Sequence, residues 1–212
     1  MPNVEAAVEA EVDPARVARC PVTPELADGL IRLADTDPAD HRRTAALLRE
    51  AGWRSLDDAL DDPAYDEPTP DIPECDLISP HGHFTYLDGY VSMPFAYQYL
   101  IGNELLEDDY WGALPGWTSE VGAWRDEFDT HTEAVVRLLR ERLGPPEYDL
   151  SQAKYDARQV VWRRESGVVV VAQGREPISY HQFHHAEIYV GSSTDQEGYF
   201  PGGSEIRELV TS

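Results

Sequence analysis

Two groups of histidines have the spacing in this sequence that best suits metal chemistry. His81 and His83 flank a single glycine, so in an extended chain both imidazoles project from one side. His181, His185 and Glu187 likewise share one face if their stretch is a strand. Two or three histidines with a carboxylate suit zinc and leave a coordination position open for water. One hypothesis is therefore a metal-dependent enzyme that uses these five residues.

The same histidines also fit a structural role. His81 and His83 flank Gly82 in a predicted turn, where polar residues are expected. Residues 181–185 form a predicted edge strand, where polar side chains discourage pairing with another strand. The sequence contains no His-Glu-x-x-His, no Gly-x-Ser-x-Gly and no phosphate-binding loop. Acidic neighbours of Cys20 and Cys75 disfavour the thiolate that a nucleophile needs. The leading interpretation is thus a non-catalytic protein without a cofactor.

The charge of the chain restricts its partners. It carries 40 acidic against 17 basic residues, a formal net charge of −23. Such a surface repels nucleic acid and anionic membranes, and it attracts a basic protein. The first residues lack the basic and apolar regions of a secretory signal, and no apolar run is long enough to span a bilayer. With only two cysteines, the sequence predicts a cytoplasmic protein with reduced thiols.

Two segments combine the features that a protein interface needs. Residues 57–76 are acidic and rich in proline, and residues 104–117 are acidic and aromatic. Aromatic side chains supply buried area in an interface, and the surrounding charges steer the partner. The alternative is that the two tryptophans of the second segment belong to the core. The predicted partner-binding residues are Asp57, Asp58, Asp61, Asp62, Asp66, Glu67, Glu104, Glu107, Asp108, Asp109, Tyr110, Trp111 and Trp117.

The elements that would position these residues are clearest in the second half of the chain. A helix is predicted over 121–143, and Gly144 with the two prolines after it ends this helix. Strands are predicted at 159–163, 168–171 and 186–190, with the four-valine run as a central strand. The helix would have one apolar face, formed by Val121, Trp124, Phe128, His131, Val135, Leu138 and Leu139.

The first half of the chain gives weaker signals. Thr23 before Pro24, and Asp37 before Pro38, each predict the start of a helix. Short strands are predicted at 77–78 and 84–87, and a short helix at 95–101. Residues 1–20 are predicted to be a helix or a frayed tail.

Together these elements predict an α+β fold, with helices packed on an antiparallel sheet and a C-terminal helix plus a three-stranded meander. The hydrophobic content of 42% is enough for a core. We divide the chain into an N-terminal helical segment (1–56), an acidic, proline-rich loop (57–76) and an α+β region (77–212). One compact domain over 21–195 is expected.

Roughly the C-terminal third of the chain also resembles known proteins. The resemblance is carried by the run VVRLLRERLGPP at 135–146, VVWR at 160–163, GVVVV at 167–171 and IYVG at 188–191. These segments resemble small acidic actinobacterial proteins, several of which are similar to the immunity proteins of polymorphic toxin systems. The resemblance implies a cytosolic protein that neutralises a cognate basic toxin by binding it. It implies no role for an individual residue.

Overall fold

The computed structural model of this chain describes residues 16–36, 40–50, 52–55, 75–79, 82–87, 90–99, 116–152, 157–175 and 183–192. Three helices lie within them: α1 (Pro24–Ala34), α2 (His41–Glu50) and α5 (Arg125–Leu143). The strands are β1 (Arg16–Arg19), β2 (Arg54–Ser55), β3 (Cys75–Ser79), β4 (Gly82–Leu87), β5 (Tyr90–Tyr99), β6 (Thr118–Val121), β7 (Tyr148–Gln152), β8 (Ala157–Arg163), β9 (Gly167–Arg175) and β10 (Phe183–Ser192).

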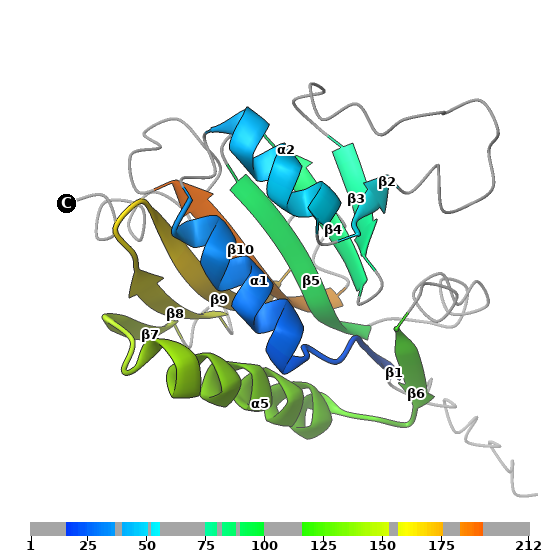
Figure 1. The fold of residues 1–212 in the computed structure, drawn as a ribbon. Coiled ribbons are helices and arrows are strands. Elements are labelled where there is room, and N and C mark those ends of the chain that lie inside the picture. Colours follow the sequence, from blue (N-terminus) through cyan, green and yellow to red (C-terminus); the bar gives the residue numbers. More distant parts are fainter. Residues whose placement is uncertain are drawn as a thin grey trace, which may run out of the picture.

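All ten strands join one antiparallel sheet (Figure 1). Its main path runs β2-β3-β4-β5-β10-β9-β8-β7. Strand β5 is long enough to pair with two strands along one edge. Strand β4 pairs with residues 90–92 and β1 with residues 96–99. Strand β6 then pairs with β1. The sheet therefore branches at β5.

The predicted fold class is wrong, because this sheet dominates the described structure. The prediction was a three-stranded meander with a C-terminal helix. The strands at the predicted meander positions are only three of the ten, and no helix among the described residues follows residue 143. The predicted helix at 95–101 is also wrong where the chain is described, since residues 95–99 belong to β5. Pairing on both edges outweighs the local helical pattern there.

Pro94 lies inside β5 without breaking it. The register with β10 shifts between Ala186 and Glu187, which pair with Ala96 and Pro94. One residue of β5, Phe95, is therefore extra at this point, as in a β-bulge. A bulge interrupts the regular ladder, and it is one of the few places where a strand tolerates a proline without an N–H donor.

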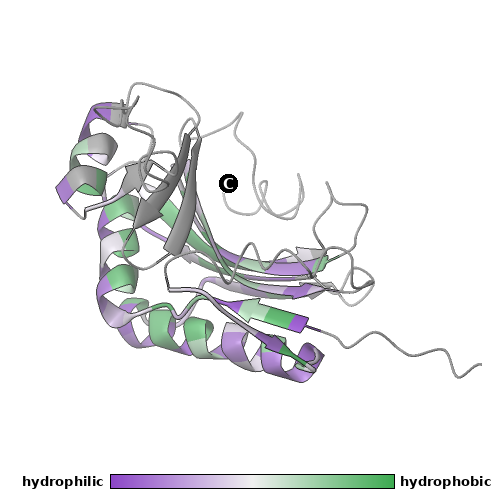
Figure 2. Ribbon diagram, turned by 90° about the vertical axis from the view of Figure 1, so that its right-hand side faces the viewer, coloured by the Kyte–Doolittle hydropathy of each residue, from purple (hydrophilic) through white to green (hydrophobic). Residues whose placement is uncertain are grey.

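The helices cover one face of the sheet (Figure 2). Helix α1 begins as predicted, with the Thr23 hydroxyl oxygen accepting from the Leu26 N–H at 3.2 Å and Pro24 in the first turn. Helix α1 packs on β9 and β10, and α5 packs on β5. Helix α5 ends at Gly144, whose φ of +81° favours glycine and whose carbonyl accepts from the Trp162 indole N–H at 3.0 Å.

The main core fills the space between this helical layer and the sheet. The four valines of β9 are all buried, as expected of an interior strand. Val169 and Val171 belong to the main core, whereas Val168 and Val170 pack on the other face of the sheet. The helical part of the core consists of Leu26, Ala27, Leu30, Leu33, Ala34, Leu48, Phe128, Val135, Val136 and Leu139.

Gly167 allows the end of α1 to approach the sheet. A Cβ atom at this position would lie 2.6 Å from the Ala34 carbonyl oxygen and 2.7 Å from that of Gly191. Both are backbone atoms, which cannot rotate away. We expect Gly167→Ala to destabilise the fold by about 1–3 kcal/mol, measured by urea unfolding. Gly29→Ala is the matched control, because a Cβ meets nothing within 4 Å there and alanine favours the helix. Equal stability of Gly167→Ala and wild type would contradict the close packing.

A charge network ties α5 to β7 and β8. The Arg158 guanidinium donates to both Asp149 oxygens, at 3.0 and 3.1 Å, and also to Glu133. Arg140 contacts the same Asp149 carboxylate at 2.8 Å. The hydrogen bond from Arg158 is the main cause that lowers the pKa of Asp149 below its ordinary value.

This network makes stability depend on pH. Because the pKa of Asp149 is lower in the folded state, its contribution is present above the unfolded pKa of about 4 and is lost as pH falls through the folded value. The carboxylate is 34% exposed, so solvent screening limits the contribution to about 1 kcal/mol or less. We expect Asp149→Asn to flatten the acid limb of a stability–pH curve. The exposed Glu165 in the β8–β9 turn provides the control, Glu165→Gln, which should leave that limb unchanged.

Candidate functional site

Most of the predicted partner-binding residues lie outside the described residues. These are Asp57, Asp58, Asp61, Asp62, Asp66, Glu67, Glu104, Glu107, Asp108, Asp109, Tyr110 and Trp111. Trp117 is described, and it is only 5% exposed. Its ring packs in a small cluster with Ala18 and Cys20, and its centroid lies 5.9 Å from that of Tyr97. Trp117 therefore belongs to the core, which is the alternative that the sequence left open.

Of the five residues predicted as a metal site, the structure brings only His185 and Glu187 together among those that it describes. His81 and His181 lie outside the described residues, and His83 pairs in register with Ile78 of β3. His185 and Glu187 do come together on β10, with 3.8 Å between Nε2 and Oε1. Among the residues that the structure describes, no group of three metal-ligating side chains is present.

Ser92 completes the polar group around Glu187. Its hydroxyl donates to Glu187 Oε2, and the ring of Tyr97 lies near that of His185, with 6.4 Å between centroids. Ser92 therefore hydrogen-bonds the carboxylate and not the imidazole. A serine nucleophile needs a base such as histidine to take its proton. This arrangement links β5 to β10 through the Ser92–Glu187 hydrogen bond.

Cys20 is also unsuited to nucleophilic chemistry. Burial raises the pKa of the Cys20 thiol to about 12, so the thiolate is scarce at neutral pH. The Cys20 carbonyl instead accepts a hydrogen bond from His131 Nε2 at 3.2 Å. Burial of the His131 ring lowers the pKa of this imidazole, which favours the neutral form.

The most distinctive surface lies at the junction of β6 and α5. Val121 and Trp124 are each 56% exposed and are the exposed large hydrophobic residues of the described chain. The sequence placed both on the apolar face of a helix, but α5 begins only at Arg125. Gly122, with a φ of +86°, turns the chain out of β6 before the helix starts. Val121 therefore ends β6 and Trp124 precedes α5, and both side chains lie outside the core, whereas Ala123 between them is buried.

Trp124 is held in place by the start of α5. It is the N-cap residue, with extended backbone angles, and its N–H donates to Glu127 Oε2 at 2.8 Å. Its carbonyl accepts from the N–H groups of Glu127 and Phe128, at 3.2 and 3.3 Å. Because both backbone groups are bonded, the backbone that carries this exposed indole is held in position. Such preorganisation lowers the entropy cost of binding.

Acidic residues flank Trp124 in the chain. The Glu120 carboxylate forms an ion pair with Arg19 at 2.7 Å, and the Glu120 side chain is 55% exposed. Asp126 and Glu127 are exposed in the first turn of α5. Three arginines lie near these residues. Arg125 is bound to Asp129 at 2.8 Å, Arg19 is paired with Glu120, and Arg16 lies opposite Val121 in the β1–β6 register. We call Glu120, Val121, Trp124, Asp126 and Glu127 the Trp124 patch. It is an apolar centre with an acidic rim.

Two features of the sequence indicate that the helix starts after Trp124, although the helical spacing of the apolar residues suggested an earlier start. Gly122 interrupts the apolar series, and Glu127 stands three residues after Trp124, the spacing with which a carboxylate caps a helix start. Together they place the helix start after residue 123.

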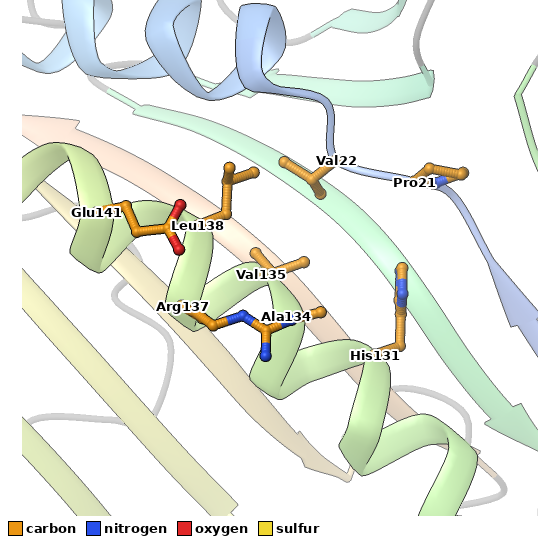
Figure 3. Close-up of a pocket in the computed structure, with 8 residues that line it drawn as sticks. All are labelled: Pro21, Val22, His131, Ala134, Val135, Arg137, Leu138 and Glu141. Atoms are coloured by element: carbon orange, nitrogen blue, oxygen red, sulfur yellow. The ribbon is translucent and has the colours of Figure 1, made fainter.

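A groove runs along the flank of α5 (Figure 3). It has a volume of about 370 Å³ and lies between α5 and the connection that joins β1 to α1. His131 stands at one end, and Arg137 and Glu141 are on the outer side. The apolar lining consists of Pro21, Val22, Ala134, Val135 and Leu138.

None of the helices in the described residues is long and apolar enough to cross a membrane.

Comparison of the chain with protein-family models, with curated proteins and with solved structures gives no significant match. The candidate surface therefore rests on its own geometry and charge.

Proposed function

We propose that this protein is a non-catalytic binding protein of the immunity type, which neutralises a basic toxin in the cytoplasm by direct contact. The observation that carries the proposal is the Trp124 patch, in which an exposed indole on a hydrogen-bonded backbone has exposed acidic residues beside it in the chain. Tryptophan is among the residues that contribute most to binding energy in interfaces. The net charge of −23 suits a positively charged partner.

The proposed mechanism has two stages. Long-range attraction between the acidic chain and a basic partner first raises the encounter rate. Burial of Trp124 and Val121 then slows dissociation. Toxins that act on nucleic acid need a basic surface to hold the phosphate backbone, so an acidic protein can cover that surface and block the substrate. The resemblance of roughly the C-terminal third of the chain to immunity proteins implies the same role.

The proposal is tested by co-expressing the chain with the products of its neighbouring genes and measuring association by stopped flow. We expect one basic partner to co-purify with a Kd below micromolar and to associate more slowly as NaCl is raised. In the same pair, the chain should restore the growth of cells that express the partner. If no product binds below micromolar and association does not depend on salt, the proposal fails.

A further inference from the structure

We infer that the contact between Arg125 and His184 is a pH-sensitive latch, which holds the start of α5 on the sheet and opens when His184 is protonated. His184 lies on β10 and is only 4% exposed. Arg125 is the first residue of α5 and directly follows Trp124. Acid would therefore loosen the turn that carries the Trp124 patch. The effect on a partner rests on the proposed function, whereas the latch is a property of the chain alone.

The geometry of the contact requires a neutral imidazole. Arg125 Nη1 lies 3.5 Å from His184 Nδ1 and 3.4 Å from Nε2. The guanidinium has donors only, and a protonated imidazole also has donors only, so an acceptor nitrogen is present only in the neutral ring. The same guanidinium lies over the Phe128 ring, 5.5 Å from its centroid, and the Phe128 and His184 rings are 6.3 Å apart. Arg125 is thus in contact with both rings.

The other charged groups near His184 offer it little compensation. On α5, the Asp129 carboxylate is bound to Arg125 Nε at 2.8 Å. The register partner of His184 on β5 is the neutral Gln98, and its register partner on β9 is Arg175. Among the described residues, these positions therefore hold two arginines and one aspartate, and the aspartate already binds an arginine.

Acid adds a second positive charge to the contact. A histidine in an unfolded chain takes up its proton near pH 6.5, at about which value the latch begins to be opposed. In the closed latch the imidazolium would lie 3.4 Å from the guanidinium at a buried position, where like charges are poorly screened. The open form therefore binds one proton more than the closed form. Its share rises as pH falls below about 6.5.

Opening of the latch acts on the backbone of the first turn. A buried charge needs water or a counter-charge, and Arg125 and Phe128 of this turn lie against the His184 ring. Water reaches the ring when the turn moves away from the sheet. The N–H groups of Glu127 and Phe128 donate to the Trp124 carbonyl at 3.2 and 3.3 Å, so these two hydrogen bonds report the movement.

Hydrogen exchange of the free chain, resolved at single amides by NMR, tests the inference. The protection of the Glu127 and Phe128 amides is measured at about pH 7.5 and about pH 5.5, on either side of the ordinary histidine titration. Each rate is divided by the intrinsic exchange rate at that pH. His184→Gln removes the titrating ring, and Arg125→Gln removes the opposing cation. Urea unfolding at both pH values establishes that each variant is folded.

His131→Gln is the matched control. His131 is also a histidine packed between α5 and the sheet, where its ring lies against Phe95 with 5.7 Å between centroids. Its Nε2 donates to the Cys20 carbonyl at 3.2 Å, and a glutamine amide retains a donor for that carbonyl. This variant removes a titrating ring from the helix without touching the latch.

We expect the protection of both amides to fall about tenfold between the two pH values in wild type and in His131→Gln. The fall should be about twofold or less in His184→Gln and intermediate in Arg125→Gln, which keeps the buried ring but not the cation. Unchanged protection in wild type, or an equal fall in wild type and either latch variant, would overturn the inference. Since no partner is present, none of these results bears on the proposed function, which the binding of Trp124→Ala tests separately.

Discussion

Replacing Trp124 by alanine should weaken binding of the basic partner by at least about 2 kcal/mol, a change of about 30-fold in Kd. Trp124 is 56% exposed in the free protein, and its backbone N–H donates to the Glu127 carboxylate. Its loss removes the apolar centre of the patch while the acidic rim stays. We therefore expect the dissociation rate to rise and the association rate to change little.

The controls separate the two stages of binding. Asp126→Asn removes one exposed charge of the rim, so it should mainly slow association at low salt. Glu165→Gln removes an exposed charge from the β8–β9 turn and should have a smaller effect. The stability of Trp124→Ala should stay within about 0.5 kcal/mol of wild type, because the side chain lies on the surface. Unchanged binding of a folded Trp124→Ala variant would remove the patch from the interface.

Phe128→Ala should have the largest effect on stability, a loss of about 3–5 kcal/mol in urea unfolding. Phe128 is 0% exposed and belongs to the main core, where it anchors the first turns of α5 to the sheet. Its ring lies under the Arg125 guanidinium, with 5.5 Å to the centroid, and beside the ring of His184, at 6.3 Å. The alanine variant leaves a cavity in a close-packed core, and the neighbouring side chains fill such a cavity only in part.

Phe128→Leu is the matched control, and it should cost less than the alanine change because it keeps most of the apolar volume. Trp124 lies only four residues away, so the pair Phe128→Ala and Trp124→Ala contrasts a buried ring with an exposed one. A loss below about 1 kcal/mol in Phe128→Ala would show that α5 is not anchored through this ring.

The parts of the fold that the sequence predicts are those with a strong local pattern. Thr23 and Pro24 mark the start of α1, and Gly144 marks the end of α5. The four valines of β9 predict an interior strand, and all four are buried. In each case the cause of the element's position lies within a few residues of the chain. The causes are a helix cap at Thr23, a glycine with positive φ at 144 and the continuous burial of the four valines.

The parts that the sequence does not predict depend on pairing between distant segments. Strand β1 is four residues long and pairs with β5 and β6, which lie about 80 and 100 positions away in the chain. No local pattern in Arg16–Arg19 distinguishes such a strand from a frayed tail. The branched sheet therefore follows from tertiary pairing, and for this reason the α+β class with a small meander was wrong.

The candidate site shows the same division. Acidic residues around an aromatic centre were expected, but in segments 57–76 and 104–117 and not at the start of α5. The helical spacing of Val121, Trp124 and Phe128 favoured a shared apolar face. Only Phe128 is buried, because Gly122 and the cap by Glu127 delay the helix to Arg125. A four-residue shift of the helix start, from 121 to 125, leaves two predicted core residues on the surface.

Hydrogen–deuterium exchange of the chain, free and bound to its basic partner, tests the central claim most directly. The account predicts slower exchange in the complex over residues 118–127, and no change in the β8–β9 turn around Glu165. Trp124→Ala should reduce this protection at equal partner concentration. Protection confined to residues 57–76 and 104–115, with unchanged exchange over 118–127, would contradict it.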